Sequence, residues 1–188
     1  MNNQTSLLEY SHFPVMLNEI LKISSPLTKK KFIDCTFGGG GYSKAILKYP
    51  NTKVFALDRD KNCKKNADAL SKKFPNRFSF SLNKFSKLSE IFKSNLNPKA
   101  IIFDLGISSL QLSDKERGFS FQSSNILNME MGINESTAYN VINNLDKEYL
   151  ANIIKILGDE KDGKKIANKI AKHRSQKPIE TSNELSLI

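Results

Sequence analysis

The sequence FIDCTFGGGGYS, residues 32–43, places an unbroken block of four glycines between an apolar segment and a segment of helical character. Adjacent glycines cost conformational entropy, so the block indicates a tight turn or a backbone that something approaches closely. A flexible linker would instead carry serines and polar flanks. A strand, a glycine turn and a helix start leave backbone N–H groups facing a ligand. The pattern therefore predicts a nucleotide-like ligand at this turn.

Strand-like and helical segments alternate over about the first 110 residues. The strand-like runs are KFIDCTF, TKVFALD, RFSFSL and AIIFDLGI, and helical segments begin near Ser43, Asp60 and Ser86. Before them, FPVMLNEILKI has a helical period that Pro26 ends. This alternation favours a parallel sheet with helices on both faces, so we expect an α/β fold.

From Ser113 onward the sequence becomes polar and poor in strand-like runs. Helical patterns occur in STAYNVINNL, KEYLANIIKIL and KDGKKIANKIAKHR. We therefore expect two domains, a ligand-binding core at residues 1–112 and a helical region at residues 113–188.

The composition excludes several classes of protein. An apolar content of 39% is compatible with a sizeable core, and no apolar run approaches the ~20 residues of a membrane span. The first residues, MNNQTSLLEYSHF, lack the features of a secretion signal, which predicts a cytoplasmic location. The two cysteines and two histidines (Cys35, Cys63, His12 and His173) show no metal-ligand spacing, so we predict reduced thiols and no metal site.

The net charge of +10 indicates a polyanionic partner. Only four of the 29 basic residues are arginine, so a solvated lysine-rich surface is the alternative explanation. The same two explanations apply to Lys165, Lys169 and Lys172, which share one face of a predicted helix.

The spacing around the glycines narrows the choice of ligand. The dinucleotide pattern G-x-G-x-x-G would need a third glycine where this chain has Ser43. Asp58 ends the next strand-like run, 20 positions after Gly38, and suits a carboxylate that accepts hydrogen bonds from ribose hydroxyls. For Asp60 the simpler role is the N-cap of the following helix.

Six motifs occur in a recognisable order: HFPVMLNEIL, IDCTFGGGGYS, ALDRD, FSKL, IIFDLGISSLQL and ERGFSF. In this order the chain closely resembles the bacterial small-subunit ribosomal RNA cytosine-N4 methyltransferases, from His12 to about Glu184. The resemblance implies S-adenosylmethionine as cofactor and small-subunit ribosomal RNA, or the small ribosomal subunit, as partner. It also implies a Rossmann-like methyltransferase sheet, of which this chain holds the first four strands, and a helical insert that faces RNA.

The resemblance further implies roles for individual residues. Gly40, Gly41 and Tyr42 are assigned to the methionine part of the cofactor. Asp58 is assigned to its ribose and Phe85 to its adenine. Asp104 and Gln111 are assigned to the closure of the site. For Phe85 the alternative is an ordinary core aromatic.

Asp104 is also the candidate catalytic residue. The cytosine amine is a poor nucleophile because its lone pair is delocalised into the ring. A carboxylate that accepts the amine's N–H would localise that pair, and Asp104 follows the fourth strand, where such a group is expected. The alternative is a carboxylate that only binds cofactor or supports the fold.

A base within folded RNA must be unstacked before it can react. Phe119 and Phe121 are candidate stacking surfaces or core residues, and Arg117 is a candidate contact to a phosphate or a carboxylate. The base pocket is assigned to Gly106, Ser108 and Ser109.

The chain departs from the family pattern in three ways. Tyr42 replaces the usual histidine, and LNMEMG replaces L-D-M-R-M-D, which puts Asn128, Glu130 and Gly132 in place of two acids and a base. Family members also continue past Ile188, so the sequence is interpreted as a fragment or as a truncated relative whose fourth strand lies at an open edge. The alternative functions are a non-catalytic cofactor- or RNA-binding remnant and a nicotinamide-dependent oxidoreductase.

Overall fold

The computed structural model describes residues 14–25, 30–92, 96–121, 123–134 and 136–188. His12 and Pro26, at which the sequence predicts the end of a helix, lie outside the described residues. The chain divides into two compact units, Met1–Gly106 (unit 1) and Ile107–Ile188 (unit 2). Unit 2 begins earlier than the predicted boundary after residue 112, because the short helix α5 (Ser109–Ser113) and its cap Ser108 belong to it.

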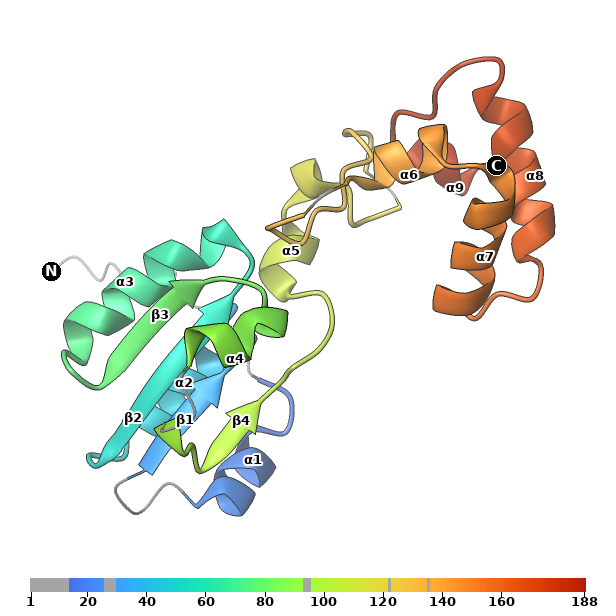
Figure 1. Cartoon of the computed structure of the whole chain (residues 1–188). Helices are drawn as coiled ribbons and strands as arrows, with labels where there is room; N and C mark the ends of the chain where they lie inside the picture. Colours follow the sequence, from blue (N-terminus) through green and yellow to red (C-terminus); the bar gives the residue numbers. More distant parts are fainter. Residues whose placement is uncertain (1–13, 26–29, 93–95, 122, 135) are drawn as a thin grey trace, which may run out of the picture. The chain divides into compact units, whose positions relative to one another are not determined.

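Unit 1 is built on a four-stranded parallel sheet, which confirms the predicted α/β class (Figure 1). The strands are β1 (Lys30–Asp34), β2 (Thr52–Asp58), β3 (Phe78–Leu82) and β4 (Ala100–Ile102). Their spatial order is β3-β2-β1-β4, and Phe32 in β1 is in register with Val54 in β2 and Ala100 in β4. The four strands correspond to the four predicted strand-like runs.

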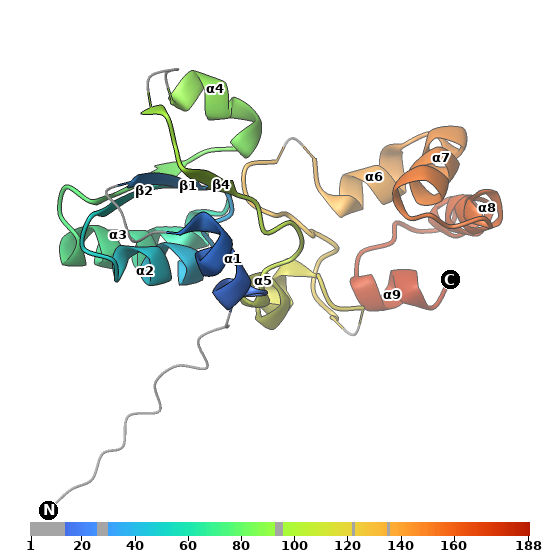
Figure 2. The ribbon, with the colours of Figure 1, turned by 90° about the horizontal axis from the view of Figure 1, so that it is seen from below.

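Helices cover both faces of the sheet, as Figure 2 shows. One face carries α1 (Leu17–Ser24), α2 (Gly41–Leu47) and α3 (Lys64–Lys73), and the other carries α4 (Leu88–Ile91). Two short 3₁₀ turns, η1 (Lys61–Cys63) and η2 (Phe85–Lys87), follow β2 and β3.

The core of unit 1 lies on both sides of the sheet. Phe32 and Val54 pack with Ile46 of α2 and Leu70 of α3 on one side. On the other side Leu57 belongs to a smaller cluster that α4 covers. Strands buried on both faces have apolar side chains in both directions, which is why FALD and FID show no strict alternation.

Unit 2 is helical, as the sequence predicted. After α5 come η4 (Lys115–Arg117), α6 (Ala138–Asn144), α7 (Lys147–Leu157), α8 (Gly163–Arg174) and α9 (Ser182–Ser186). Leu150 of α7 and Ile170 of α8 are buried together at its core. A Cβ atom at Gly163 would lie 2.8 Å from the Ala151 carbonyl oxygen, so glycine allows α7 and α8 to approach closely there.

Candidate functional site

Three aspartates lie at the carboxyl ends of strands in unit 1. Asp34 ends β1, Asp58 ends β2 and Asp104 follows β4 by two residues. Parallel strands bring their carboxyl ends to one edge of the sheet. The chain builds β2 and β3 on one side of β1 and then crosses to β4 on the other, so the strand order reverses between β1 and β4. Ligands of open α/β sheets bind at such a switch point.

Asp58 ties the glycine turn to the end of β2. Its Oδ2 accepts a hydrogen bond from the Gly38 N–H at 2.7 Å, and its Oδ1 accepts one from the Asp60 N–H at 2.9 Å. A carboxylate oxygen can accept more than one hydrogen bond, so both oxygens retain acceptor capacity for a ribose diol. Asp60 is buried and caps η1 by accepting from the Asn62 N–H at 3.0 Å, which confirms the predicted N-cap.

The four glycines of the turn are not equivalent. A Cβ atom at Gly40 would lie 2.7 Å from the Phe37 ring, and one at Gly41 would overlap Pro14. At Gly39 nothing lies within 4 Å, and the residue is exposed. Packing within unit 1 therefore requires the glycines at 40 and 41, whereas the open side of the turn is at Gly39. Nothing in the uniform sequence GGGG distinguishes these positions.

The Tyr42 side chain belongs to the core, with 7% of its surface exposed. Its hydroxyl donates to the Val15 carbonyl oxygen at 2.5 Å. Burial, together with the nearby carboxylates of Asp104 and Asp34, raises the pKa of the phenol, which stays protonated at neutral pH. A contact between Tyr42 and the cofactor stays a prediction. Because the side chain is buried, this contact would have to be made by the Tyr42 backbone.

Asp34 is a fully buried acid that was not predicted from the sequence as a residue of the site. Its Oδ2 accepts from the Ser43 hydroxyl at 2.7 Å, and its Oδ1 accepts from the Thr36 N–H at 3.4 Å. Burial raises its pKa to about 6, and the charge of Asp58 adds to the rise. The hydrogen bond to Ser43 fixes the first turn of α2 to the end of β1. The available signal was an acid at the end of an apolar strand, four positions before the first glycine of the block.

Asp104 is anchored across the switch point. Its N–H donates to the Thr36 hydroxyl at 2.8 Å, and the Cys35 N–H donates to the Ile102 carbonyl at 2.9 Å. The segments that follow β4 and β1 are thus joined, and the Asp104 side chain is partly exposed beside the Tyr42 phenol.

Phe85 is not a buried core residue. It is 43% exposed and makes an edge-to-face contact with Phe103, with ring centroids 5.5 Å apart and an angle of 87° between the rings. The two rings follow β3 and β4, which lie at opposite edges of the sheet, so this pair spans the carboxyl edge. Phe103 is therefore a second aromatic candidate for the site, and the sequence did not indicate it.

Gln111 belongs to unit 2, so its part in the cofactor site stays a prediction. It is buried and forms a capping box at the start of α5, in which its Oε1 accepts from the Ser108 N–H at 2.9 Å and its own N–H donates to the Ser108 hydroxyl. Ser108 is one of the residues assigned to the base pocket. Another, Gly106, is exposed and has a φ of +142°. The side chain of Ser109 lies outside the described residues.

Arg117 contacts other residues of unit 2. Its guanidinium donates to the Glu130 carbonyl oxygen and lies 5.6 Å from the Phe119 ring centroid. Because this bond uses the backbone of Glu130, the change from a basic to an acidic side chain at that position does not remove it. Phe121 is 71% exposed and remains available for stacking. Of the other two replaced positions in LNMEMG, Gly132 has φ of +124°, and the buried Oδ1 of Asn128 has no hydrogen-bond partner among the described residues.

The described residues contain no group of three acidic, histidine or cysteine side chains arranged to hold a metal ion. Both cysteines are buried, and neither forms a disulfide in the described part of the chain. Within the same residues, no helix has the length and apolar character needed to cross a membrane.

The doubly wound sheet, with a glycine turn and acidic residues at its carboxyl edge, defines a Rossmann-like α/β unit. The sequence model of the MraW methylase family matches residues 9–188, and the chain belongs to this family. The predicted resemblance is thereby confirmed.

Similar curated proteins include several named ribosomal RNA small subunit methyltransferase H. The protein from Ehrlichia canis (strain Jake) is 42% identical over 180 residues, which cover 94% of this chain and 61% of the relative. The protein from Rickettsia canadensis (strain McKiel) is 40% identical over 181 residues, which cover 96% of this chain and 58% of the relative. The chain thus spans about three fifths of the length of these relatives.

Proposed function

We propose that the chain supplies the S-adenosylmethionine site of an enzyme that methylates the N4 amine of a cytosine in small-subunit ribosomal RNA. Unit 1 is the cofactor-binding part and unit 2 the part that faces RNA. The hydrogen bond from Gly38 to Asp58 is the observation that carries the proposal, because it sets a ribose-type acceptor beside an open glycine turn. Membership of the methylase family and the names of the relatives support the chemistry. We place the activity in the cytoplasm, with the small ribosomal subunit.

The residues at the carboxyl edge fit the parts of this cofactor. Asp58 accepts from the ribose hydroxyls, the exposed face of Phe85 packs on the adenine, and the open backbone at Gly39 admits the chain that carries the sulfonium. When bound, S-adenosylmethionine supplies a methyl group on a positively charged sulfur. Gly40 and Gly41 contribute through their backbone, since their Cα hydrogens face Phe37 and Pro14.

Asp104 acts on the cytosine. Its carboxylate accepts one N–H of the exocyclic amine, which returns lone-pair density to nitrogen and stabilises the positive charge that develops there. The hydrogen bond from its N–H to Thr36 holds the carboxylate in position, and such positioning accounts for most of the rate gain expected with a weak nucleophile.

Nucleoside analysis tests the proposal. Small ribosomal subunits are incubated with methyl-labelled S-adenosylmethionine and a protein that spans the full length of the relatives, and the RNA is then digested to nucleosides. We expect the label in N4-methylcytidine at one position, and we expect Asp104→Asn to lower turnover with little change in cofactor affinity. Label in another nucleoside, or full turnover by Asp104→Asn, would contradict the assignment.

A further inference from the structure

Unit 2 contains a hollow of about 410 Å³ between α7 and α8. Lysines dominate its lining: Lys147 and Lys155 come from α7, and Lys161 and Lys164 come from the start of α8 and the turn before it. Glu148 is the one acid among the lining residues. Because α7 and α8 pack closely at Gly163, these side chains project from a firmly joined helix pair.

Among the residues that the structure describes, three of the four lysines have no neutralising partner. Glu148 pairs with Lys147 at 3.7 Å, and the nearby Asp162 pairs with Lys165 at 2.8 Å. Across the described part of the chain, no carboxylate forms an ion pair with Lys155, Lys161 or Lys164. Three ammonium groups that share one concavity repel one another and concentrate positive potential there, so an anion is attracted more strongly than to separate surface lysines.

We propose that this lysine hollow binds the phosphate backbone of RNA. The choice of RNA as the polyanion rests on the proposed function. A lysine ammonium is a point charge without the planar fork with which arginine reads base edges, so these contacts position RNA without selecting its sequence. The amides of Asn152 and Asn168, which also line the hollow, can bond ribose hydroxyls beside the phosphates.

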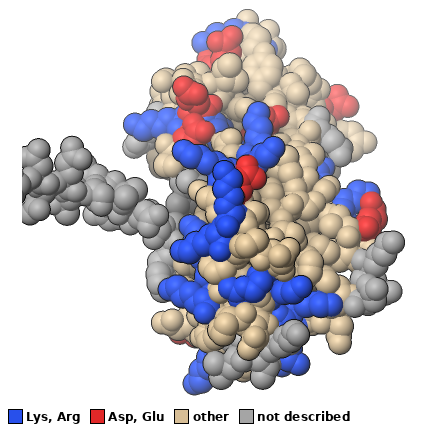
Figure 3. Space-filling view, turned by 90° about the vertical axis from the view of Figure 1, so that its left-hand side faces the viewer, with Lys and Arg blue, Asp and Glu red and all other residues tan. Residues whose placement is uncertain are grey.

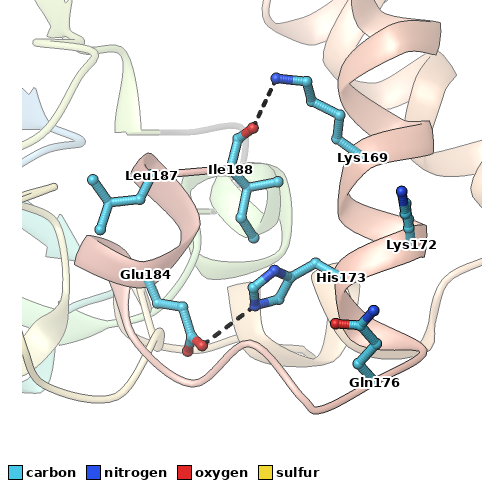
Figure 4. Close-up of a pocket in the computed structure, with 7 residues that line it drawn as sticks. All are labelled: Lys169, Lys172, His173, Gln176, Glu184, Leu187 and Ile188. Carbon is cyan, nitrogen blue, oxygen red and sulfur yellow. Dashed lines mark hydrogen bonds and ion pairs between the residues drawn. The ribbon is translucent and has the colours of Figure 1, made fainter.

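The other basic surfaces of the chain are weaker candidates. In the hollow beside α9, Figure 4 shows Glu184 turned toward His173 and Lys169 reaching the Ile188 carbonyl oxygen, at 3.0 Å. The helical face of Lys165, Lys169 and Lys172, which the sequence suggested as an RNA contact, is thus largely engaged within the protein. On the side of unit 1 that bears α3, basic side chains are spread over the surface (Figure 3).

An anionic membrane is a less suitable partner for the hollow. Surface binding to lipid combines basic side chains with apolar ones that insert among the acyl chains. The exposed apolar residues of α7, such as Ile156 and Leu157, do not line the hollow, and Ala151 is its one apolar lining residue.

Two triple variants with the same change in charge test the proposal. The hollow variant is Lys155→Gln/Lys161→Gln/Lys164→Gln, and the matched control is Lys165→Gln/Lys169→Gln/Lys172→Gln. Binding of a labelled single-stranded RNA of mixed sequence is followed by fluorescence anisotropy over a range of salt concentrations, without cofactor. We expect the hollow variant to lose at least about tenfold in affinity at low salt. Its plot of log affinity against log salt should lose about 2 in slope, at about 0.7 per phosphate released.

The control variant should lose clearly less affinity and slope, and a Lys→Arg triple in the hollow should retain both. Equal losses in the two Gln triples would show that only net charge matters and would overturn the proposal. So would unchanged RNA binding by the hollow variant together with lost binding to phosphatidylserine vesicles. Calorimetry with S-adenosylmethionine on the same variants separates this result from the proposed function, because cofactor affinity should not change.

Discussion

At the scale of single residues, the glycine turn shows how one short motif combines two requirements. Gly41 is needed because Pro14 packs against its Cα, whereas Gly39 faces open space. Packing explains the glycine at position 41, whereas no contact within unit 1 requires glycine at position 39, where the open space lies on the side that a ligand would enter.

Substitution separates these two requirements. We expect Gly39→Val to change the stability of unit 1 by no more than about 0.5 kcal/mol and to weaken S-adenosylmethionine binding by tenfold or more. Gly41→Ala should cost about 1–3 kcal/mol of stability through overpacking against Pro14. Thermal unfolding and calorimetry measure the two effects, and normal cofactor affinity in a folded Gly39→Val protein would refute the role of the open turn.

Asp34 makes stability depend on pH in an unusual direction. Its pKa is raised from 3.8 to about 6, so between these values the folded state binds more protons than the unfolded state. The contribution of Asp34 to the free energy of unfolding therefore falls as pH rises through this window, by up to about 3 kcal/mol, and the loss is complete above pH 6.

Asp34→Asn removes this titration and retains an acceptor for the Ser43 hydroxyl. We expect the variant to gain stability relative to the parent chain as pH rises from 4 to 7, as measured by urea unfolding at several pH values. Parallel pH profiles for the two proteins would show that Asp34 does not titrate in this range.

At the scale of elements, Glu184 of α9 forms ion pairs with His173 of α8 and with Lys177, which follows α8. Glu184 pairs with Lys177 at 2.6 Å and with His173 at 3.5 Å. The pKa of the Glu184 carboxyl is lowered to about 2, mainly by its hydrogen bond with the Lys177 ammonium. A lowered carboxyl pKa contributes stability that is present above the ordinary value of 4.5 and is lost as pH falls toward 2.

We expect Glu184→Gln to speed hydrogen exchange in α9 at neutral pH and to leave exchange in α7 unchanged. High salt should produce part of the same effect in the parent chain, because the Lys177 side chain is 67% exposed and its ion pair is screened. Unchanged exchange in α9 would mean that packing of residues such as Leu185, rather than charge, holds this helix.

Strand β4 is the second element with a testable consequence. It pairs with β1, and no other described strand lies beside it, while Ile101 and Phe103 are 43% and 47% exposed. An apolar edge of this kind is a site for pairing with another chain.

A polypeptide of residues 1–188 should therefore self-associate, and Ile101→Lys should reduce this association in sedimentation experiments. Ser89→Lys on the exposed surface of α4 adds the same charge and serves as the control. Equal effects of the two substitutions would show that association depends on net charge rather than on the strand edge.

At the scale of the whole molecule, much of the fold could be predicted because it depends on local pattern. The alternation of apolar and helical runs predicted the four strands, and the change in composition predicted a helical second part. Spacing alone pointed to Asp58 at the end of β2. The roles of Tyr42 and Asp34 could not be predicted, because they depend on Val15 and Ser43, which only the folded chain brings against them. For the same reason the sequence did not reveal the lysine hollow, which joins α7 to α8.

The most direct test of the central claim is calorimetric titration of the chain with S-adenosylmethionine, in parallel with Asp58→Ala and Asp68→Ala. Asp68 is an exposed acid on α3 and matches the change in charge, whereas Asp60 is buried and caps η1, which makes it unsuitable as a control. We predict that Asp58→Ala loses about 1.5–3 kcal/mol of binding free energy, the cost of removing hydrogen bonds to a charged acceptor, and that Asp68→Ala binds like the parent chain. Equal affinity in all three proteins, or binding of a nicotinamide dinucleotide in place of S-adenosylmethionine, would contradict the account.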